Sequence, residues 1–190
     1  MPHQGIDPIA VSTQLYQAWQ LIVSRSVSPT DAAVISVTQI HAGDTWNVVP
    51  NAVTLRGTVR TLRPETRDLI EQRMGERAEL ICRAFGAKAH FHYLRRYPAT
   101  INTRNEAGIA ELAAAATGAD RPVLTDLAPS MASEDFSYML NEKPGAYIWI
   151  GNGPAEGGHN LHSPRYDFND EVLPTGVEYW VRLVNRVLAA

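Results

Sequence analysis

Apolar residues in the first hundred positions recur first at helical spacing and then at strand spacing. After Asp7-Pro8, which can cap and open a helix, they return every three or four positions up to Ser28-Pro29. Residues 32–41 are rich in Val, Ile and Thr, and residues 53–61 alternate apolar and polar side chains, as a half-buried strand does. The pattern predicts one helix followed by two strands.

A second helix and a third strand complete this region. Pro64-Glu65 opens an apolar helical stripe that closes near Gly86, and residues 88–95 form the third predicted strand. The order helix, strand, strand, helix, strand is that of a ferredoxin-like βαββαβ unit without its first strand. One sheet position is therefore expected to be vacant, which we interpret as a sign that the natural domain begins upstream of Met1.

The pattern changes beyond Tyr97-Pro98, so two domains are predicted, residues 1–98 and residues 99–190, in a mixed α+β or α/β protein. The second domain is expected to end in an amphipathic helix. Its predicted elements are, in order, an Ala-rich helix over 105–117, a helix start at 133–136, a buried strand over 145–150, a glycine-rich loop over 151–158 and a last helix over 173–187.

Composition narrows the classes of function. Hydrophobic residues make up 45% of the chain, enough for a core. The 17 basic and 20 acidic side chains give a net charge of −3, which leaves no basic excess to neutralise a phosphate backbone, so no nucleic-acid partner is expected. The single cysteine, Cys82, cannot form an internal disulfide, and no apolar run is long enough to span a bilayer. A cytoplasmic protein without a membrane partner is predicted.

The loop after the predicted strand 145–150 contains several side chains that could bind a metal or a substrate. His159 and His162 lie there beside an arginine and several carboxylates, at the kind of strand end where α/β enzymes keep their sites. Imidazole is a good zinc ligand, and a nearby carboxylate can orient it. The alternative is a polar surface loop, since two histidines do not complete a tetrahedral site.

Two further pairs are candidates. Glu134 and Asp135 could contact a substrate or orient a metal ligand, although helix capping explains the same residue types. Asn47 and Arg60 offer an amide and a guanidinium fork, which suit a substrate carboxylate, although solvated arginines are common on strands. The chain contains no Gly-x-Ser-x-Gly elbow, phosphate loop or Gly-x-Gly-x-x-Gly run, which disfavours serine hydrolases and nucleotide enzymes.

Six short runs resemble one family in register along the whole chain. The family is that of the metal-dependent amidohydrolases and peptidases (metallopeptidase family twenty), and the runs are most similar to its hippurate hydrolase, N-acyl-L-amino-acid amidohydrolase and indoleacetyl-amino-acid hydrolase branch. The runs are Met1-Pro-His-Gln-Gly-Ile-Asp-Pro8, Val37-Thr-Gln-Ile-His-Ala-Gly-Asp44, Asn47-Val-Val-Pro50, Leu55-Arg-Gly-Thr-Val-Arg-Thr61, Ser133-Glu-Asp-Phe136 and Leu161-His-Ser-Pro-Arg-Tyr-Asp-Phe-Asn-Asp170.

The resemblance implies a ferredoxin-like lid, which also forms a homodimer, followed by the C-terminal segment of a zinc-exopeptidase-like α/β catalytic domain. It implies two divalent metals, zinc or manganese, in each intact site, with His162 as one ligand. Asn47 and Arg60 match substrate-binding positions, and Glu134 and Asp135 match a run near the pocket.

Hydrolysis of a small N-acyl amino acid is the implied reaction, with most metal ligands and the general base lying upstream of this chain. No catalytic residue is therefore assigned within it, and the chain alone is expected to be inactive. The alternative is a module without metal that dimerises and binds a small carboxylate.

Overall fold

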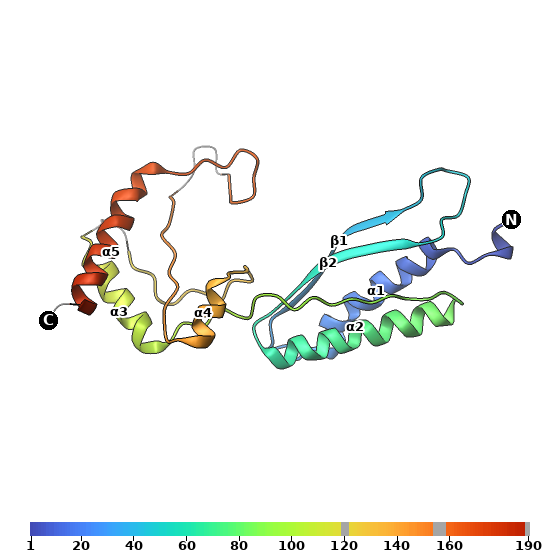
Figure 1. Cartoon of the computed structure of the whole chain (residues 1–190), viewed down its shortest axis with the longest axis horizontal. Helices are drawn as coiled ribbons and strands as arrows, with labels where there is room; N and C mark the ends of the chain where they lie inside the picture. The colour runs from blue at the N-terminus through green and yellow to red at the C-terminus, as the bar shows by residue number, and fades with distance from the viewer. Residues whose placement is uncertain (119–121, 154–158, 189–190) are drawn as a thin grey trace. The chain divides into compact units, whose positions relative to one another are not determined.

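The computed structural model describes residues 1–118, 122–153 and 159–188 and divides into two compact units (Figure 1). We call Met1–Ala99 the N-terminal unit and Thr100–Ala190 the C-terminal unit. Each unit is described by itself. Within the described residues, no helix combines the length and the apolar character that crossing a membrane requires.

The N-terminal unit is a two-stranded antiparallel hairpin with two long helices against it (Figure 1). Both helices contact the hairpin and each other. The predicted order helix, strand, strand, helix is confirmed. After a short 3-10 turn, η1 (Pro2–Gln4), the elements are α1 (Pro8–Ser26), β1 (Ala33–Ala42), β2 (Val53–Thr61) and α2 (Pro64–Ala84).

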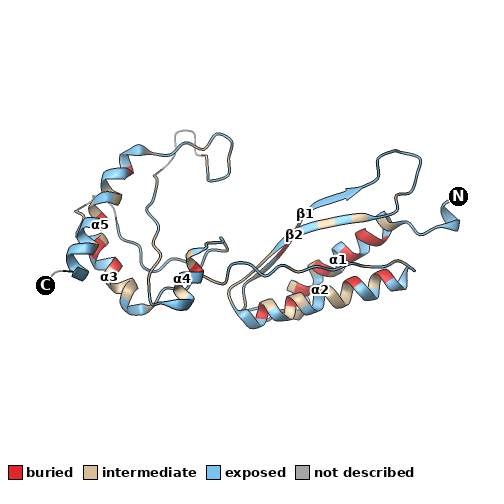
Figure 2. Cartoon of the chain, viewed as in Figure 1, coloured by how far each residue is buried: buried red, intermediate tan, exposed pale blue. Residues whose placement is uncertain are grey.

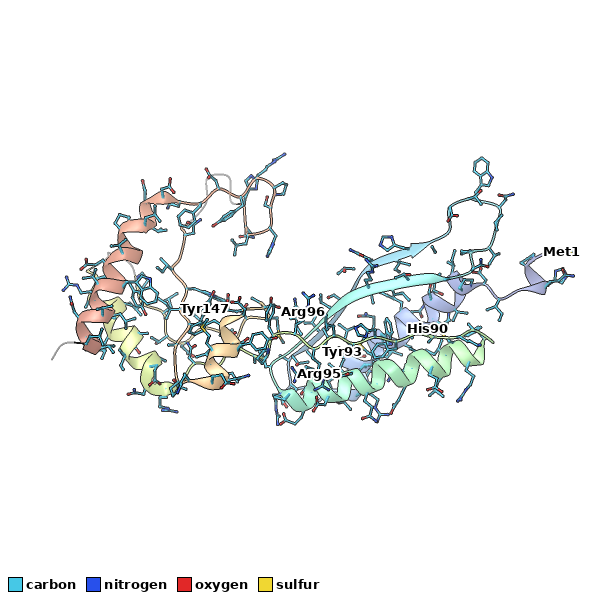
Figure 3. All side chains as sticks on the ribbon, viewed as in Figure 1. Met1, His90, Tyr93, Arg95, Arg96 and Tyr147 are labelled. Atoms are coloured by element: carbon cyan, nitrogen blue, oxygen red, sulfur yellow. The ribbon has the colours of Figure 1, made fainter. Side chains whose placement is uncertain are left out.

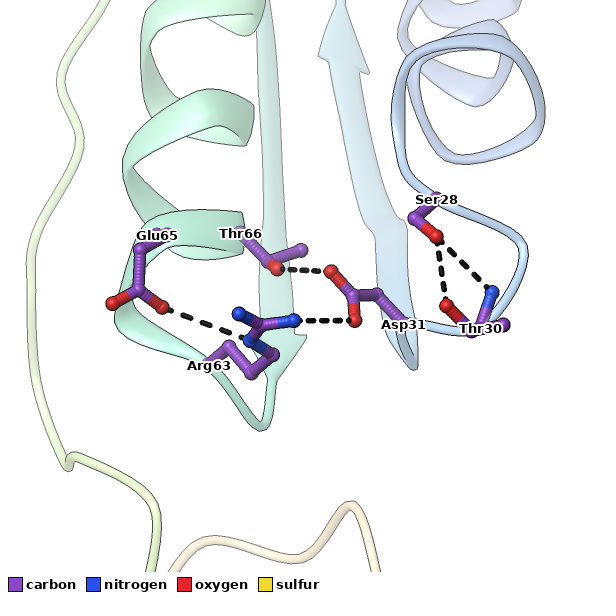
Figure 4. Close-up of polar contacts among 6 residues, drawn as sticks. All are labelled: Ser28, Thr30, Asp31, Arg63, Glu65 and Thr66. Atoms are coloured by element: carbon purple, nitrogen blue, oxygen red, sulfur yellow. Dashed lines mark hydrogen bonds and ion pairs between the residues drawn. The ribbon is translucent and has the colours of Figure 1, made fainter.

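Local chemistry explains where these elements begin. The Asp7 carboxylate accepts hydrogen bonds from the backbone N–H groups of Ile9 and Ala10 at 2.9 and 3.3 Å, which satisfies two donors that a helix start leaves open. Asp31, just before β1, accepts hydrogen bonds from Thr66 Oγ1 at 3.0 Å and from Arg63 Nη1 at 3.2 Å (Figure 4). The turn before β1 is thereby tied to the first turn of α2.

The core of the N-terminal unit lies between the helices and the inner face of the hairpin (Figure 2). Ile22 on α1 and Ile70 on α2 are completely buried. Trp19 is also buried and donates its indole N–H to the Met74 carbonyl at 3.0 Å, which satisfies its one polar atom. The buried members of the cluster are Leu15, Trp19, Ile22, Val27, Ile35, Ile70, Met74 and Ala78.

The third predicted strand, residues 88–95, is not a strand in the structure. Ala89 and Tyr93 nevertheless pack against the core, as the period-two pattern predicts. A strand exists only through a ladder with a neighbour, and the sheet of the described residues contains β1 and β2 alone. The prediction was wrong because the sequence pattern reports which face is buried and not whether a neighbouring strand is present.

The C-terminal unit contains α3 (Arg104–Ala115), α4 (Phe136–Glu142), η2 (Asp170–Val172) and α5 (Leu173–Leu188). The predicted strand over 145–150 is again absent, because its backbone is bonded by the side chains of Asn102 and Thr103 and by one isolated backbone hydrogen bond instead of a ladder. Asn102 donates to the Tyr147 carbonyl and accepts from its N–H at 2.9 and 2.8 Å, while the Gly145 carbonyl accepts from the Thr103 N–H at 3.0 Å. Residues 154–158 of the predicted glycine-rich loop lie outside the described residues.

Helix α5 leaves much of its apolar side uncovered. Tyr179 is buried, but the stripe that the sequence predicts for the core is exposed (Figure 2). α3 and α5, with residues 145 and 146, line an open apolar groove of about 410 Å³. The predicted stripe consists of Leu173, Val177, Trp180, Val184 and Val187, and all five are exposed. Val181 and Leu188 are exposed as well, and we call these seven residues together the apolar stripe of α5.

Candidate functional site

His162 lies at the tip of an exposed turn in the C-terminal unit. Its φ of 70° is the only positive value among the non-glycine residues described. The turn is closed by the Ser163 N–H donating to the Asn160 carbonyl and the Tyr166 N–H donating to the Ser163 carbonyl, both at 3.1 Å. Left-handed backbone at a non-glycine residue is uncommon and concentrates at functional sites. The strained position therefore coincides with the predicted metal ligand.

Two asparagines anchor the ends of this loop. Asn152 accepts from the Asn169 N–H at 2.9 Å and donates to the Tyr166 hydroxyl at 3.1 Å. Asn169 donates back to the Asn152 carbonyl at 3.2 Å and accepts from the Glu171 N–H at 3.1 Å, which caps η2. The sequence analysis missed this pair. Its one available clue was an asparagine between two glycines, Gly151-Asn152-Gly153, in the glycine-rich loop.

The metal-binding capacity of the described residues is limited. Within residues 1–118, 122–153 and 159–188, no three His, Cys, Asp or Glu side chains gather closely enough to hold a metal ion. The exposed imidazole of His162 has the chemistry of one ligand, but a structural or catalytic zinc site uses at least three protein ligands. The donor set present here does not complete a metal site.

Glu134 makes specific contacts beside the start of α4. Its Oε2 accepts from the Tyr147 hydroxyl at 2.8 Å, and its Oε1 accepts from the Phe136 N–H at 3.3 Å. Asp135 precedes the helix but makes no side-chain capping bond. Capping therefore explains only part of the role of Glu134, which also ties α4 to the segment around Tyr147.

The hydrogen bond from Tyr147, more than that from the Phe136 N–H, holds the pKa of Glu134 below its ordinary value. In return, the Glu134 carboxylate raises the pKa of the Tyr147 phenol. A depressed carboxyl pKa contributes stability above the pKa of the unfolded chain, and this contribution is lost as the pH falls through the folded value.

Replacing Tyr147 with phenylalanine should raise the pKa of Glu134 toward its ordinary value, because the largest stabiliser of the carboxylate is removed. The side-chain carboxyl carbon of Glu134, followed by NMR through an acid titration, gives the value directly. Tyr16→Phe, a substitution in the N-terminal unit, should leave that titration unchanged. An unshifted midpoint in Tyr147→Phe would show that the contact does not control Glu134.

Asn47 and Arg60 lie at opposite ends of the hairpin. Asn47 is in the exposed β1–β2 connection, where it accepts from the Thr45 hydroxyl at 3.2 Å, next to Trp46, whose exposed fraction is 99%. Arg60 is seven residues beyond Val53 in β2 and opposite Val34 at the far end of the ladder. At about 3.3 Å per residue, these seven steps separate Val53 from Arg60 by roughly 23 Å. Asn47 lies in the connection that precedes Val53. One chain does not bring them together.

The apolar groove between α3 and α5 holds none of the candidate residues. Among the described residues that line it, Glu106 is the one acidic residue, and its carboxylate accepts from the hydroxyl of Thr103 and the amide of Asn105. The groove is therefore separate from the candidate chemistry of the C-terminal unit, which is confined to the His162 turn and the Glu134–Tyr147 pair.

Comparison with known proteins relates both units to one family. The chain is 36% identical over 173 residues to the N-acetyl-L-cysteine deacetylase of Bacillus subtilis (strain 168), covering 91% of this chain and 40% of that protein. It is 33% identical over 188 residues to an N-acetylcysteine deacetylase of the same organism, covering 99% and 48%. It is 34% identical to the N-acetyldiaminopimelate deacetylase of Enterococcus faecalis (strain ATCC 700802 / V583), covering 93% and 46%. The chain spans less than half the length of these relatives.

A solved structure supports the same family relationship. The Bacillus subtilis YXEP protein, described as a dinuclear metal binding peptidase from the M20 family, matches with a TM-score of 0.74 and 30% identity over 97% of this chain and 47% of that one. The family model for Peptidase family M20/M25/M40 matches residues 7–186, across both units. The resemblance inferred from the six runs is thus confirmed, and the chain belongs to Peptidase family M20/M25/M40.

Proposed function

We propose that this chain forms part of a metal-dependent amidohydrolase that hydrolyses the amide bond of small N-acyl amino acids, hippurate-like substrates included, in the cytoplasm. The observation that carries the proposal is the single family match over residues 7–186, shared with relatives that are named deacetylases of N-acetylated amino acids. Because the chain spans less than half of those relatives, we assign it a part of the site and no activity of its own.

His162 is the proposed metal ligand. Its exposed turn, held at both ends by Asn152 and Asn169, presents one imidazole from a strained backbone position. In the complete enzyme, two zinc or manganese ions would supply an activated water for attack on the amide carbonyl. Glu134, ionised through its bond from Tyr147, and Asp135 are proposed to lie near the same pocket.

Asn47 and Arg60 are proposed to bind substrate from the lid, with the Arg60 guanidinium holding the carboxylate. Since the two residues lie at opposite ends of one hairpin, they cannot hold one small substrate together within one chain. A homodimer through the lid resolves this, because a second copy can contribute the other residue. The outer edge of β1, unpaired among the described residues, supports such an association.

A second candidate function is a module that dimerises and binds a small carboxylate without metal. The observation that favours it is the incomplete donor set of the described residues. The two candidates predict different behaviour when this chain is joined to the rest of a family member: the first predicts metal binding and hydrolysis, and the second predicts neither.

The test is a chimera in which this chain replaces the matching region of the Bacillus subtilis N-acetylcysteine deacetylase. We expect the chimera to bind metal and hydrolyse N-acetyl-L-cysteine, with N-benzoylglycine as the hippurate-like probe. His162→Ala should lower its kcat/KM by more than the roughly 10- to 100-fold that loss of an outer-shell partner of a metal ligand costs. Metal content by elemental analysis should fall with it, and the neighbouring His159→Ala should retain both.

The isolated chain provides the opposite arm of the test. It should bind substoichiometric zinc or manganese and leave N-benzoylglycine intact. Stoichiometric metal with turnover by the isolated chain would contradict the partial-site proposal. An active chimera that tolerates His162→Ala would remove His162 from the metal site, whereas a chimera without metal would favour the carboxylate-binding module.

A further inference from the structure

The outer face of the hairpin, which is the face turned away from α1 and α2, carries two arginines on one strand. Leu55 and Val59 of β2 pack against the core, so the side chains that alternate with them point outward. Arg56 and Arg60 therefore both lie on the outer face. Gln39 of β1 is paired with Arg56 across the ladder, and residues directly opposite each other share a face. Gln39 and Arg56 are thus side-chain neighbours.

Residues 87–98 add further basic side chains. Tyr93 packs against the core and Arg95 pairs with Asp68 and Glu71 of α2, so the odd-numbered positions of this segment turn toward the helices (Figure 3). In extended backbone, the even-numbered positions then point away from the helices. Neither β1, β2 nor residues 87–98 contain an aspartate or a glutamate, so no carboxylate of these segments opposes the positive charge. The exposed basic or imidazole side chains at the even-numbered positions are Lys88, His90, His92 and Arg96.

Arg56 and Arg60 lack a counter-charge. Among the described residues, neither forms an ion pair, and Arg60 donates only to the backbone carbonyl of Val59, at 3.1 Å. Arg73 on α2, by contrast, pairs with Glu76 at 3.0 Å. Two like charges four residues apart on one face repel each other, so an anion bound between them lowers the electrostatic energy of both. The outer face of the hairpin is therefore favourable for an anion.

Gln39 is oriented so that it can donate beside Arg56. Its Oε1 lies 3.3 Å from Nε2 of His41, and because an amide oxygen only accepts, the imidazole N–H is the donor of this hydrogen bond. Within the part of the chain that the structure describes, the Gln39 side chain makes no other hydrogen bond, so both amide hydrogens are left for a ligand. A guanidinium and an amide nitrogen side by side can each donate to one carboxylate, and hydrogen bonds between charged partners are the stronger kind.

We propose that Arg56 and Gln39 form a second carboxylate site, and that the complete enzyme therefore prefers N-acyl derivatives of acidic amino acids such as glutamate. The inference rests on the proposed function, in which Arg60 holds the first carboxylate of the substrate. Arg56 and Arg60 are four residues apart, roughly 13 Å along β2, and each carries a long, flexible side chain. One small molecule with two carboxylates can thus engage both arginines of a single chain.

The experiment follows the backbone amide NMR shifts of the isolated chain at low ionic strength, where exposed charges are screened least. The probes are N-acetyl-L-glutamate and N-acetyl-L-glutamine, which match in size and differ by one carboxylate. N-acetyl-L-glutamate should shift the signals of residues 54–60 and of Gln39. It should bind roughly three- to fivefold more tightly than N-acetyl-L-glutamine, the range that a solvent-exposed ion pair supplies.

Two arginine variants test whether the preference belongs to this site. Arg56→Gln should make the two affinities equal and leave the signals of α1 and α2 in place, since Arg56 is exposed. Arg73→Gln, the matched control, removes the same charge from α2 and should keep the preference. Equal affinities in the unmodified chain would overturn the proposal, as would a preference that survives Arg56→Gln. Loss of the preference in both variants would overturn it too, because net charge would then be its cause.

The deacetylase chimera separates this inference from the proposed function. In an active chimera, Arg56→Gln should lower the ratio of kcat/KM for N-acetyl-L-glutamate over N-acetyl-L-glutamine by roughly threefold or more, through KM with kcat unchanged. An active chimera whose ratio does not change contradicts the second carboxylate site alone. A chimera inactive toward these probes and toward N-acetyl-L-cysteine contradicts the proposed function, and binding to the isolated chain then decides whether Arg56 holds a carboxylate.

Discussion

Replacing Ile70 with alanine is expected to lower the free energy of unfolding of the N-terminal unit by roughly 2–5 kcal/mol. Ile70 is completely buried on α2 within the cluster that joins both helices to β1. Removing its side-chain methyl and methylene groups takes apolar surface out of the core and leaves a cavity whose neighbours, Ile22 among them, can only partly close it. Urea unfolding, followed by the NMR signals of α1 and α2, measures the loss.

Leu80→Ala on the same helix is the matched control. Leu80 is 53% exposed, so its truncation is expected to change stability by no more than about 0.5 kcal/mol. Both substitutions introduce alanine, and the helix propensities of isoleucine and leucine differ by less than about 0.7 kcal/mol, so a larger difference between the variants reports burial. Equal losses in the two variants would mean that the cluster around Ile70 does not hold the unit together.

Gly57→Ala is expected to destabilise the hairpin by about 1–3 kcal/mol or more through overpacking. A Cβ at this position would stand 2.2 Å from the Ser36 carbonyl oxygen and 2.9 Å from Val37 Cα, both atoms of the opposite strand's backbone. The ladder is irregular between Val37 and Gln39, directly beside this contact. Because backbone cannot rotate away as a side chain can, the two strands must separate locally, which the loss of hairpin NMR signals at low urea would report.

Gly108→Ala supplies the control with the opposite sign. Gly108 lies inside α3, and a Cβ there would meet no atom within 4 Å. Alanine should therefore stabilise the C-terminal unit by about 0.5–1 kcal/mol, because glycine loses more backbone entropy in a helix. If Gly57→Ala were instead as well tolerated as Gly108→Ala, the close approach of β2 to β1 at this point would be refuted.

The parts of the fold that the sequence predicts correctly are those that depend on nearby residues. α1 begins where Asp7 caps it, and β1 pairs with β2 through one short connection. The spacing of apolar residues and the residues at the element ends are therefore sufficient to predict these three elements. Residues 88–95 and 145–150 were predicted as strands from the same kind of pattern, but a strand also depends on a neighbour from elsewhere in the chain. No local pattern reports whether that neighbour is present.

The candidate site also combines features that the sequence predicts with features that only the structure reveals. The residue type of His162 and the resemblance of its run make it a candidate metal ligand. The structure adds its left-handed backbone, which the sequence pattern does not predict. The hydrogen bonds donated by the Tyr147 hydroxyl to Glu134 and by the Asn169 N–H to Asn152 join residues 13 and 17 positions apart. Sequence spacing does not predict such contacts. The distance between Asn47 and Arg60 likewise became visible only once the register of the hairpin was known.

The uncovered face of α5 governs how this polypeptide behaves in concentrated solution. Its apolar stripe presents a tryptophan, four valines and two leucines to water along one helix. Contiguous apolar surface of this kind promotes association, and a net charge of only −3 supplies little repulsion to oppose it. Self-association of the chain through this stripe is therefore expected to increase with protein concentration and with salt.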